Sequence, residues 1–275
     1  MSIHSVIESM QKSESVHTRE GFLHRCHMDL EPFVYSYLRN TYGKALSKHW
    51  SSCTIPREST KGIVIVERRC HPNLEFILHN AVYFAPGYSV HVICSEANAQ
   101  FVKETCGSQL ESIHIHPVYS DIGTQESGKK EYNMLLKMYG FWSFFSEEWL
   151  LCMEMDSYLL RHLPPEIYNY SYIGSKWPWL PNEPGGGGIT HRKRSFMLEV
   201  TTIDSLQHLD MQDTVASQGL VLLGLPIMEG NLFGEVLIDY NTIGTHQWWT
   251  FSSVISKENM PAYLNIVLTL HLDKT

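Results

Sequence analysis

A run of β-branched residues, Gly62-Ile-Val-Ile-Val-Glu67, constrains the fold of this chain more than any other segment. Both faces of such a strand are apolar, which is typical of a buried strand in a parallel sheet. Helical spacing follows over Asn73 to Phe84, Pro86-Gly87 ends that helix, and Tyr88 to Cys94 is a second apolar strand. The sequence therefore predicts a β-α-β unit.

The same alternation continues along the chain. The next expected elements are a short helix, a strand, a longer helix and a strand, at Ala97–Thr105, Ile113–Pro117, Lys129–Phe145 and from Trp149. Two short strands and a helix are expected at Tyr172–Gly174, Gly185–Thr190 and Arg194–Val200. This pattern predicts an α/β domain with a Rossmann-like, mostly parallel central sheet flanked by helices. Helical spacing before Trp50 predicts an N-terminal helical extension over residues 1–60, with the α/β domain over 61–275.

Composition excludes several classes of protein. Hydrophobic residues make up 43% of the 275 residues, which argues against disorder. The net charge of −8 argues against nucleic acid as a partner. Apolar stretches such as Trp149 to Met153 fall far short of the roughly 20 residues that a membrane-spanning helix needs. Polar residues and histidines at the N-terminus do not form a secretory signal, so a cytoplasmic protein with free cysteines is expected.

Two carboxylates stand where a buried strand ends, in the segment Glu154-Met-Asp156-Ser157. Side chains at alternate positions of a strand point to the same side, so both carboxylates can approach one cation. Mg²⁺ and Mn²⁺ favour a few carboxylates together with substrate phosphates. An ordinary solvated strand end remains the alternative for these two acids taken alone.

A run of four glycines occurs in Pro184-Gly-Gly-Gly-Gly-Ile189 and is followed by the basic segment His191 to Arg194. Consecutive glycines allow a ligand to approach the backbone closely. The segment lacks the Gly-Lys-Ser/Thr ending of a Walker loop, and no G-x-G-x-x-G follows the first strand, which argues against nucleoside triphosphatases and dinucleotide oxidoreductases. A flexible linker and a functional loop are equally compatible with the run.

A third candidate group lies near the C-terminus, where His246 and Trp248 follow the acidic residue Glu229. A neutral imidazole can complete a metal site begun by distant carboxylates. Neighbouring tryptophans can stack on a sugar or a base. Most of the other histidines, of which the chain has 15 in all, show no spacing that marks a site.

In this order the segments resemble the GT-A class of nucleotide-sugar glycosyltransferases, in particular the poorly characterised GT-A-like branch of large DNA viruses, fungi and bacteria. The resemblance covers about Lys61 to Phe251. The matching segments are Ile63–Pro72, Leu74–Phe76, Asn98–Val102, Tyr132–Leu136, Phe141–Trp142, Met155–Ser157, Tyr172–Gly174, Trp177–Pro178, Gly187–Ile189, Glu229, Leu232–Phe233 and His246.

The resemblance implies metal-dependent transfer of a sugar from a nucleoside diphosphate sugar, such as a UDP- or GDP-sugar, to a hydroxyl of a glycan or glycoconjugate acceptor. Glu154 and Asp156 would stand at the acidic D-x-D metal motif, with Glu replacing the first Asp. Together with His246 they would hold Mn²⁺ or Mg²⁺. If the chain is viral, the expected location is the cytoplasm of the host cell.

The resemblance also implies roles for residues around the donor and the acceptor. The residues expected to surround the nucleotide sugar are Val66, Glu67, Asn133, Lys137, Asp156, Gly187 and Gly188. In an inverting enzyme Glu229 would be the base, although Gly230 stands where related sequences usually carry a second acid. Acceptor sugars would stack on Trp177, Trp179 and Trp248, unless these indoles fill the core.

Two other functions remain open. The Glu154 variant of the metal motif and the missing second acid at Gly230 are compatible with an inactive GT-A-like module that binds sugars or acts as a scaffold. A metal-dependent phosphohydrolase would need more clustered carboxylates and histidines than the sequence offers.

Overall fold

The computed structural model of this chain describes residues 7, 19–180, 183–256 and 258–273. Its centre is a six-stranded sheet with the strand order β3-β2-β1-β4-β7-β6. The strands are β1 (Lys61–Val66), β2 (Ser89–Ser95), β3 (Ile113–Tyr119), β4 (Trp149–Met153), β6 (Tyr172–Ser175) and β7 (Gly186–Lys193).

The sheet is mixed, and the prediction of a mostly parallel sheet is met only in part. Strands β1 to β4 pair in parallel, whereas β7 is antiparallel to both of its neighbours, β4 and β6. A parallel pair needs a crossover connection, usually a helix, but the chain from Ser175 to Gly186 contains no helix among its described residues. This part of the chain therefore turns back and pairs antiparallel.

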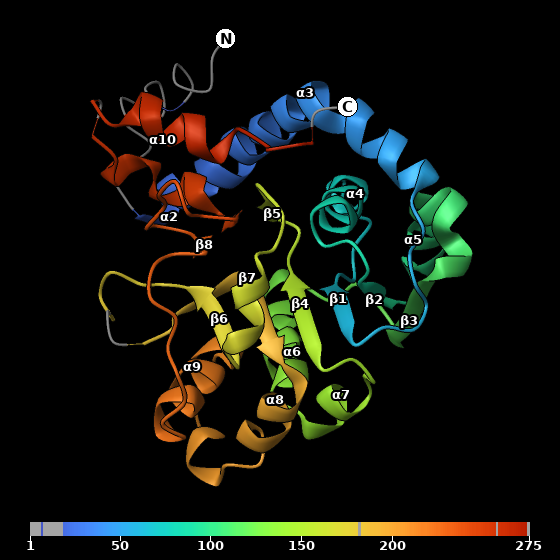
Figure 1. Cartoon of the computed structure of the whole chain (residues 1–275), viewed down its shortest axis with the longest axis vertical. Coiled ribbons are helices and arrows are strands. Elements are labelled where there is room, and N and C mark those ends of the chain that lie inside the picture. The colour runs from blue at the N-terminus through green and yellow to red at the C-terminus, as the bar shows by residue number, and fades with distance from the viewer. Residues whose placement is uncertain (1–6, 8–18, 181–182, 257, 274–275) are drawn as a thin grey trace.

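Helices cover both faces of the sheet (Figure 1). Alternate side chains of β1 point to opposite faces, Ile63 and Ile65 into one hydrophobic cluster and Val64 into another. The first cluster includes residues of α3 (Glu31–Ser52), α4 (Leu74–Phe84), α5 (Ala99–Cys106) and α10 (Met260–Val267). The second includes residues of α6 (Gln125–Leu136), α7 (Tyr139–Ser143), α8 (Arg194–Val200) and α9 (Gln212–Leu222).

The single helix expected over Lys129 to Phe145 is instead the pair α6 and α7, so that expectation was wrong. Met138 between them has an extended backbone, with φ −85° and ψ 130°. The buried indole of Trp142 donates a hydrogen bond to the carbonyl of Leu136, at 2.8 Å. Burial of that indole therefore stabilises the break between the two helices.

Of the extension predicted over residues 1–60, residues 19–52 are helical and pack into the domain core, and residues 1–6 and 8–18 lie outside the described residues. Its described elements are α2 (Arg19–Arg25), the π-helical turn η2 (Cys26–Leu30) and α3. The buried ring of Tyr35 in α3 makes edge contacts with Phe76, Tyr158 and Trp249. Helix α3 thus shares one hydrophobic core with residues from the rest of the chain.

A second, three-stranded sheet lies beyond the end of β4. It consists of β5 (Ser157–Leu159), β9 (Gly244–His246) and β8 (Phe233–Gly234), with β5 antiparallel and β8 parallel to β9. Short 3₁₀ helices complete the described structure: η3 (Gly107–Ser112), η4 (Pro165–Asn169), η5 (Asp204–Leu206) and η6 (Trp248–Val254).

Among the described residues, no helix has the length and apolar character needed to cross a membrane. All six cysteines are free.

Candidate metal centre

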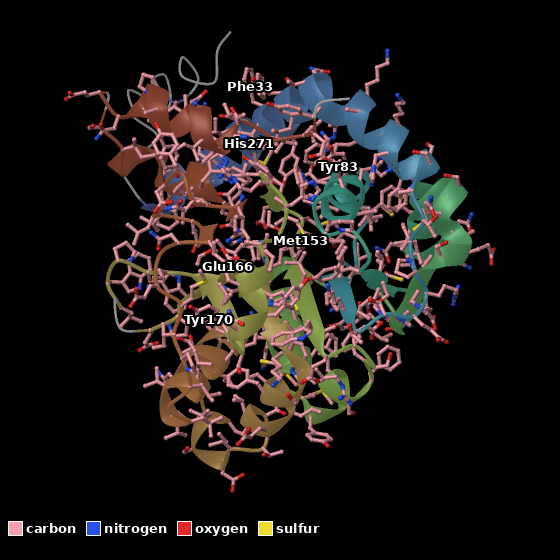
Figure 2. The ribbon with its side chains drawn as sticks, in the orientation of Figure 1. Phe33, Tyr83, Met153, Glu166, Tyr170 and His271 are labelled. Carbon is pink, nitrogen blue, oxygen red and sulfur yellow. The ribbon has the colours of Figure 1, made fainter. Side chains whose placement is uncertain are left out.

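The acidic motif lies in a turn at the carboxyl end of the central strand β4, whose last residue, Met153, is labelled in the middle of the molecule in Figure 2. The backbone N–H of Glu154 donates to the carbonyl of Gly188 in β7, at 2.7 Å. The Ser157 hydroxyl and N–H both donate to the carbonyl of Glu154, at 2.8 and 3.2 Å. The turn between β4 and β5 therefore holds Glu154 and Asp156 at the edge where open α/β sheets bind ligands.

The pairing of β5 with β9 brings in the third predicted ligand. Ser157 lies opposite His246 in that ladder. His246 Nε2 is 3.2 Å from Asp156 Oδ1 and 3.9 Å from Glu154 Oε2. One ligand atom from each of the three side chains lies within 4.8 Å of the others. The structure thus brings together the three residues that the sequence predicts as metal ligands; we call them the carboxylate triad.

Several polar atoms in this place have no hydrogen-bond partner among the described residues. These atoms are buried, and they are Asp156 Oδ1, both ring nitrogens of His246 and the hydroxyl of Ser175. Asp156 and His246 are close, but their atoms are not aligned for a hydrogen bond. Buried polar groups normally have partners, and those without one need an explanation. With the nearby carboxylate of Glu154, the partnerless Asp156 oxygen and His246 imidazole make a donor set that fits Mn²⁺ or Mg²⁺.

The charges of the triad shift one another's pKa values. Burial and the negative charge of Asp156 raise the pKa of Glu154 to about 7. Burial acts against the charged form of Asp156 as well, but the positive charge of His246 outweighs it and holds the pKa of Asp156 well below its usual range. Burial also opposes protonation of His246, and the charge of Asp156 and the carboxylate of Glu235 outweigh it, so the pKa of His246 lies well above its usual value. Without a metal the imidazolium therefore balances the carboxylates.

Glu235 is a member of this site that sequence reasoning missed. Its Oε1 lies 3.3 Å from His246 Nδ1, and its side chain is 13% exposed. A carboxylate on the far nitrogen fixes the orientation and tautomer of a ligating histidine. Glu235 directly follows β8, and only the parallel pairing of β8 with β9 places it beside His246. The one sequence signal for Glu235 is an acid that directly follows a strand. That strand, β8, has only two residues and is too short to recognise in the sequence.

The glycine run forms most of the first half of β7, so the interpretation as a flexible linker is wrong. A Cβ atom on Gly188 would lie 2.5 Å from Cδ2 of the His246 ring and 2.9 Å from Cβ of Glu154. Gly187 has φ +97°, a region that side chains other than glycine rarely adopt. These glycines therefore leave the space that the His246 ring occupies.

At the end of β1, Val66 is partly buried and Glu67 is buried. Glu67 accepts hydrogen bonds from Arg69 through both oxygens, at 2.7 to 2.8 Å. The Arg69 side chain is 61% exposed, and its pKa is raised first by Glu67 and further by Asp156 and Glu31. The buried amide of Asn98 holds this loop by donating to the carbonyls of Glu67 and Arg69. Glu67 thus positions a cation, Arg69, that sequence reasoning did not select.

Asn133 and Lys137 join α6 to the chain that leads into α9. Asn133 Oδ1 accepts from the N–H of Gln212 at 2.9 Å, and Lys137 Nζ donates to the carbonyl of Leu209 at 2.7 Å. The buried carboxylate of Asp213 follows and accepts from the N–H of Gly187 at 3.4 Å. In this structure the two predicted nucleotide contacts therefore hold Asp213 near the glycine strand. Helix α6 reaches the triad through Tyr132, whose hydroxyl hydrogen-bonds to Glu154.

Of the three tryptophans predicted to contact the acceptor, two lie at or near the surface and one lies in the core. Trp177 is partly buried and Trp179 is 59% exposed, and their rings lie parallel with centroids 6.3 Å apart. Trp248 is fully buried, and its indole donates to Tyr158 at 2.8 Å. The prediction that an acceptor sugar stacks on Trp248 is therefore wrong, because core packing covers the ring. Glu229 is exposed in the loop between α9 and β8.

The comparisons with known proteins add a family match and no function. A family described as a protein of unknown function (DUF5672) matches residues 119–222, which include β4, the acidic motif and the glycine strand. No curated protein matches the chain.

Proposed function

We propose that this chain is a metal-dependent glycosyltransferase of the GT-A type that moves a sugar from a UDP- or GDP-sugar to a hydroxyl of a glycan or glycoconjugate in the cytoplasm. The observation that carries the proposal is the carboxylate triad, in which Asp156 Oδ1 and both ring nitrogens of His246 are buried without a hydrogen-bond partner among the described residues. Its place at the carboxyl end of β4 agrees with the position of ligands in open α/β sheets.

In this function Glu154, Asp156 and His246 would hold Mn²⁺ or Mg²⁺. The cation would neutralise the developing charge of the departing nucleoside diphosphate. Asp156 is the main ligand, since it is the carboxylate whose ionised form the site favours. Glu235 orients the imidazole of His246 from the other side. Gly188 keeps the space in which that imidazole lies.

Arg69 supports the same chemistry from the end of β1. Its guanidinium is largely exposed, and the buried carboxylate of Glu67 holds it at the end of β1, where a diphosphate could reach it. Glu67 raises the pKa of Arg69 first, and the negative charge of Asp156 contributes in the same direction. Guanidinium groups are well suited to bind phosphate oxygens in pairs. We assign Arg69 to the diphosphate, next to the predicted contacts Val66 and Glu67.

An inverting reaction needs a base for the acceptor hydroxyl. Glu229 is the residue that the resemblance favours, and it is exposed in the loop before β8. Asp213 is a second carboxylate, and it lies against the glycine strand that also contacts His246. The base is Asp213 if Asp213→Asn loses transfer while Glu229→Gln keeps it. The base is Glu229 if the two variants give the opposite results.

The stacked pair Trp177 and Trp179 offers a surface for the acceptor sugar.

The test is a panel of UDP- and GDP-sugars with Mn²⁺, in which release of the nucleoside diphosphate is measured with wild-type protein and with Asp156→Ala. At least one donor is expected to turn over with the wild type only. Glu183→Gln is a matched control, because this carboxylate accepts a hydrogen bond from the Ser217 hydroxyl and does not belong to the triad. Saturable donor binding with no turnover would instead favour the inactive sugar-binding or scaffolding module. If no donor binds or turns over, the result contradicts both the transferase and the sugar-binding module.

A further inference from the structure

A second group of three metal-ligating side chains occurs among the described residues, and it lies away from the carboxylate triad. It consists of His91, His114 and His116, with one ring nitrogen from each within 4.8 Å of the others. We call it the histidine cluster. From this arrangement we infer a binding site for a divalent transition metal ion, with Zn²⁺ as the preferred ion.

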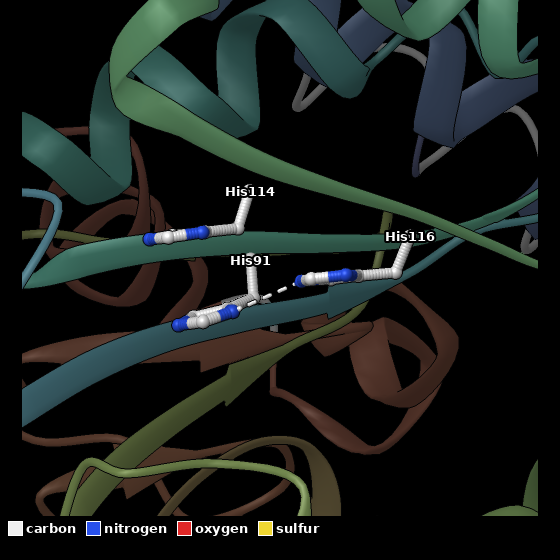
Figure 3. Close-up of side chains that lie close together, drawn as sticks. All are labelled: His91, His114 and His116. Carbon is white, nitrogen blue, oxygen red and sulfur yellow. Dashed lines mark hydrogen bonds between the residues drawn. The ribbon is translucent and has the colours of Figure 1, made fainter.

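Strand pairing puts the three histidines on one face of the sheet. His91 in β2 lies opposite His114 in the parallel strand β3, and His116 follows two residues later on the same face. The rings lie in nearly parallel planes (Figure 3), with an angle of 10° between His91 and His114 and 14° between His91 and His116. Strand β3 is the edge of the sheet, so the cluster opens toward solvent: His91 is buried and the other two are partly buried.

The separation of two ring nitrogens suits a shared metal ion. His91 Nδ1 and His116 Nε2 are 3.2 Å apart, on the dashed line of Figure 3. Two imidazole nitrogens at about 2.0–2.1 Å from a tetrahedral Zn²⁺ lie roughly 3.3–3.4 Å from each other. For both nitrogens to bind the ion, the proton between them must move to His116 Nδ1 or to solvent, and both rings must turn so that their lone pairs meet at the metal.

A buried carboxylate supports the ligand with the least exposure. Glu147 Oε1 accepts from His91 Nε2 at 2.9 Å and from the Ser89 hydroxyl at 2.5 Å. The other Glu147 oxygen accepts from the N–H of Ser146 at 3.0 Å. With its Nε2 proton held by Glu147, His91 keeps its Nδ1 lone pair directed at His116. Carboxylate–histidine–zinc arrangements of this kind are usual behind ligating histidines.

The third histidine is fixed in a similar way. His114 Nε2 lies 2.8 Å from the carbonyl of Arg57, to which it can donate its proton. Its Nδ1 then carries the lone pair, and the Arg57 guanidinium approaches that nitrogen only to 3.5 Å. Three imidazoles leave one tetrahedral position for water, and three neutral nitrogen ligands favour Zn²⁺ over Mn²⁺ or Mg²⁺.

The site would join the edge strand β3 to β2 through a metal ion. Its ligands lie among the first four residues of β2 and β3, whereas the carboxylate triad lies beyond the carboxyl end of β4. Its composition of three nitrogen donors also separates it from the two oxygens and one nitrogen of the triad. The inference is therefore independent of the proposed transferase function.

The test is a calorimetric titration of metal-free full-length protein with Zn²⁺. Asp156→Ala is used as the background, so that the carboxylate triad does not contribute. One zinc ion per chain is expected to bind, and the double variant His114→Gln/His116→Gln is expected to lose this saturable binding. His208→Gln is the matched control, because this histidine is exposed and lies outside the cluster. Equal zinc binding by the double variant would overturn the inference, as would the absence of saturable binding in the background.

Two further measurements keep the test decisive if the double variant folds poorly. Glu147→Gln should weaken zinc binding about 10- to 100-fold, whereas its neighbour Glu148, partly exposed and paired with Lys193, should tolerate Glu148→Gln without loss. In wild-type protein, Zn²⁺ should protect His114 and His116, but not His208, from modification by diethyl pyrocarbonate, as read by mass spectrometry. No protection of the cluster at saturating Zn²⁺ would contradict the site.

Discussion

The carboxylate triad and the histidine cluster are built on the same sheet in opposite ways. The triad lies in a turn beyond the end of β4, and its three residues come together only because a second sheet folds back over that turn. The cluster lies within two paired strands, where register alone sets the distances. In the triad, Asp156 Oδ1 and both ring nitrogens of His246 lack hydrogen-bond partners among the described residues, whereas in the cluster most nitrogens already have one.

This difference changes the charge of each place. Asp156 and Glu235 raise the pKa of His246 well above its usual value against the effect of burial. In the cluster, burial and the neighbouring imidazoles His91 and His114 lower the pKa of His116 to about 4. One site therefore offers two carboxylates and an imidazole to a hard cation, and the other offers only imidazole nitrogens to a softer one. A metal that binds both sites equally well would contradict this comparison.

The largest effect is expected from Asp156→Ala. Removal of the main carboxylate should lower Mn²⁺-dependent donor binding and turnover about a hundredfold or more, in line with the loss of one preorganised charge-stabilising group. Zinc binding by the histidine cluster should not change. Mn²⁺ and Zn²⁺ titrations of the same variant, with circular dichroism as the check of the fold, measure both. Loss of saturable zinc binding in this variant would contradict the inferred zinc site.

A smaller effect is expected from Gly188→Ala. The new methyl group would meet the His246 ring, with 2.6 Å to Nε2, and would push the imidazole from its place. Overpacking of this kind costs about 1–3 kcal/mol of folding stability, and displacement of a ligand should lower Mn²⁺ affinity about 10- to 100-fold. Gly140→Ala is the control, because no atom lies within 4 Å of the added methyl group. Equal Mn²⁺ affinity in both variants would remove Gly188 from the site.

Local sequence patterns were enough to predict the first strands and helix of the central sheet. The apolar runs of β1 and β2 and the helical spacing of α4 appear where the sequence places them, within a few residues. The acidic motif was also placed correctly, because it directly follows a buried strand. The sequence did not reveal the antiparallel pairing of β7, which depends on a partner strand far along the chain. It also did not separate the buried Trp248 from the exposed Trp179.

The residues that support each site were harder to predict than its ligands. Glu235 acts through a strand of two residues, and Arg69 through the buried carboxylate of Glu67, so neither has a local pattern. The histidine cluster has a weak one, since His114 and His116 alternate in an expected strand and His91 lies in the strand before it. Parallel register, which brings His91 opposite His114, is invisible in a single sequence.

The two sites should also differ in their response to pH. Mn²⁺ must displace protons from His246 and from Glu154, whose pKa is raised to about 7, so its affinity should fall as the pH is lowered. From pH 8 to 7 the fall should be about tenfold for the His246 proton and about twofold for the Glu154 proton, which is already mostly lost at pH 8. The pKa of His116 is near 4, so zinc binding should change less over this interval. Calorimetry at both pH values measures the two slopes, and equal slopes would contradict the contrast in charge.

The smallest effect is expected from Arg57→Gln, which tests whether the cluster responds to charge in the way a cation site must. The exposed Arg57 guanidinium lies 3.5 Å from His114 Nδ1, where it competes for the nitrogen and repels an incoming cation. An exposed charge contributes up to about 1 kcal/mol, so its removal should raise zinc affinity about two- to fivefold. Arg194→Gln is a control on the same face of the sheet, because that guanidinium bonds to the carbonyl of Trp142. Mn²⁺ affinity should stay constant in both variants, because neither arginine contacts the carboxylate triad. Weaker zinc binding in Arg57→Gln would mean that the arginine helps to hold the ligands instead of opposing the ion.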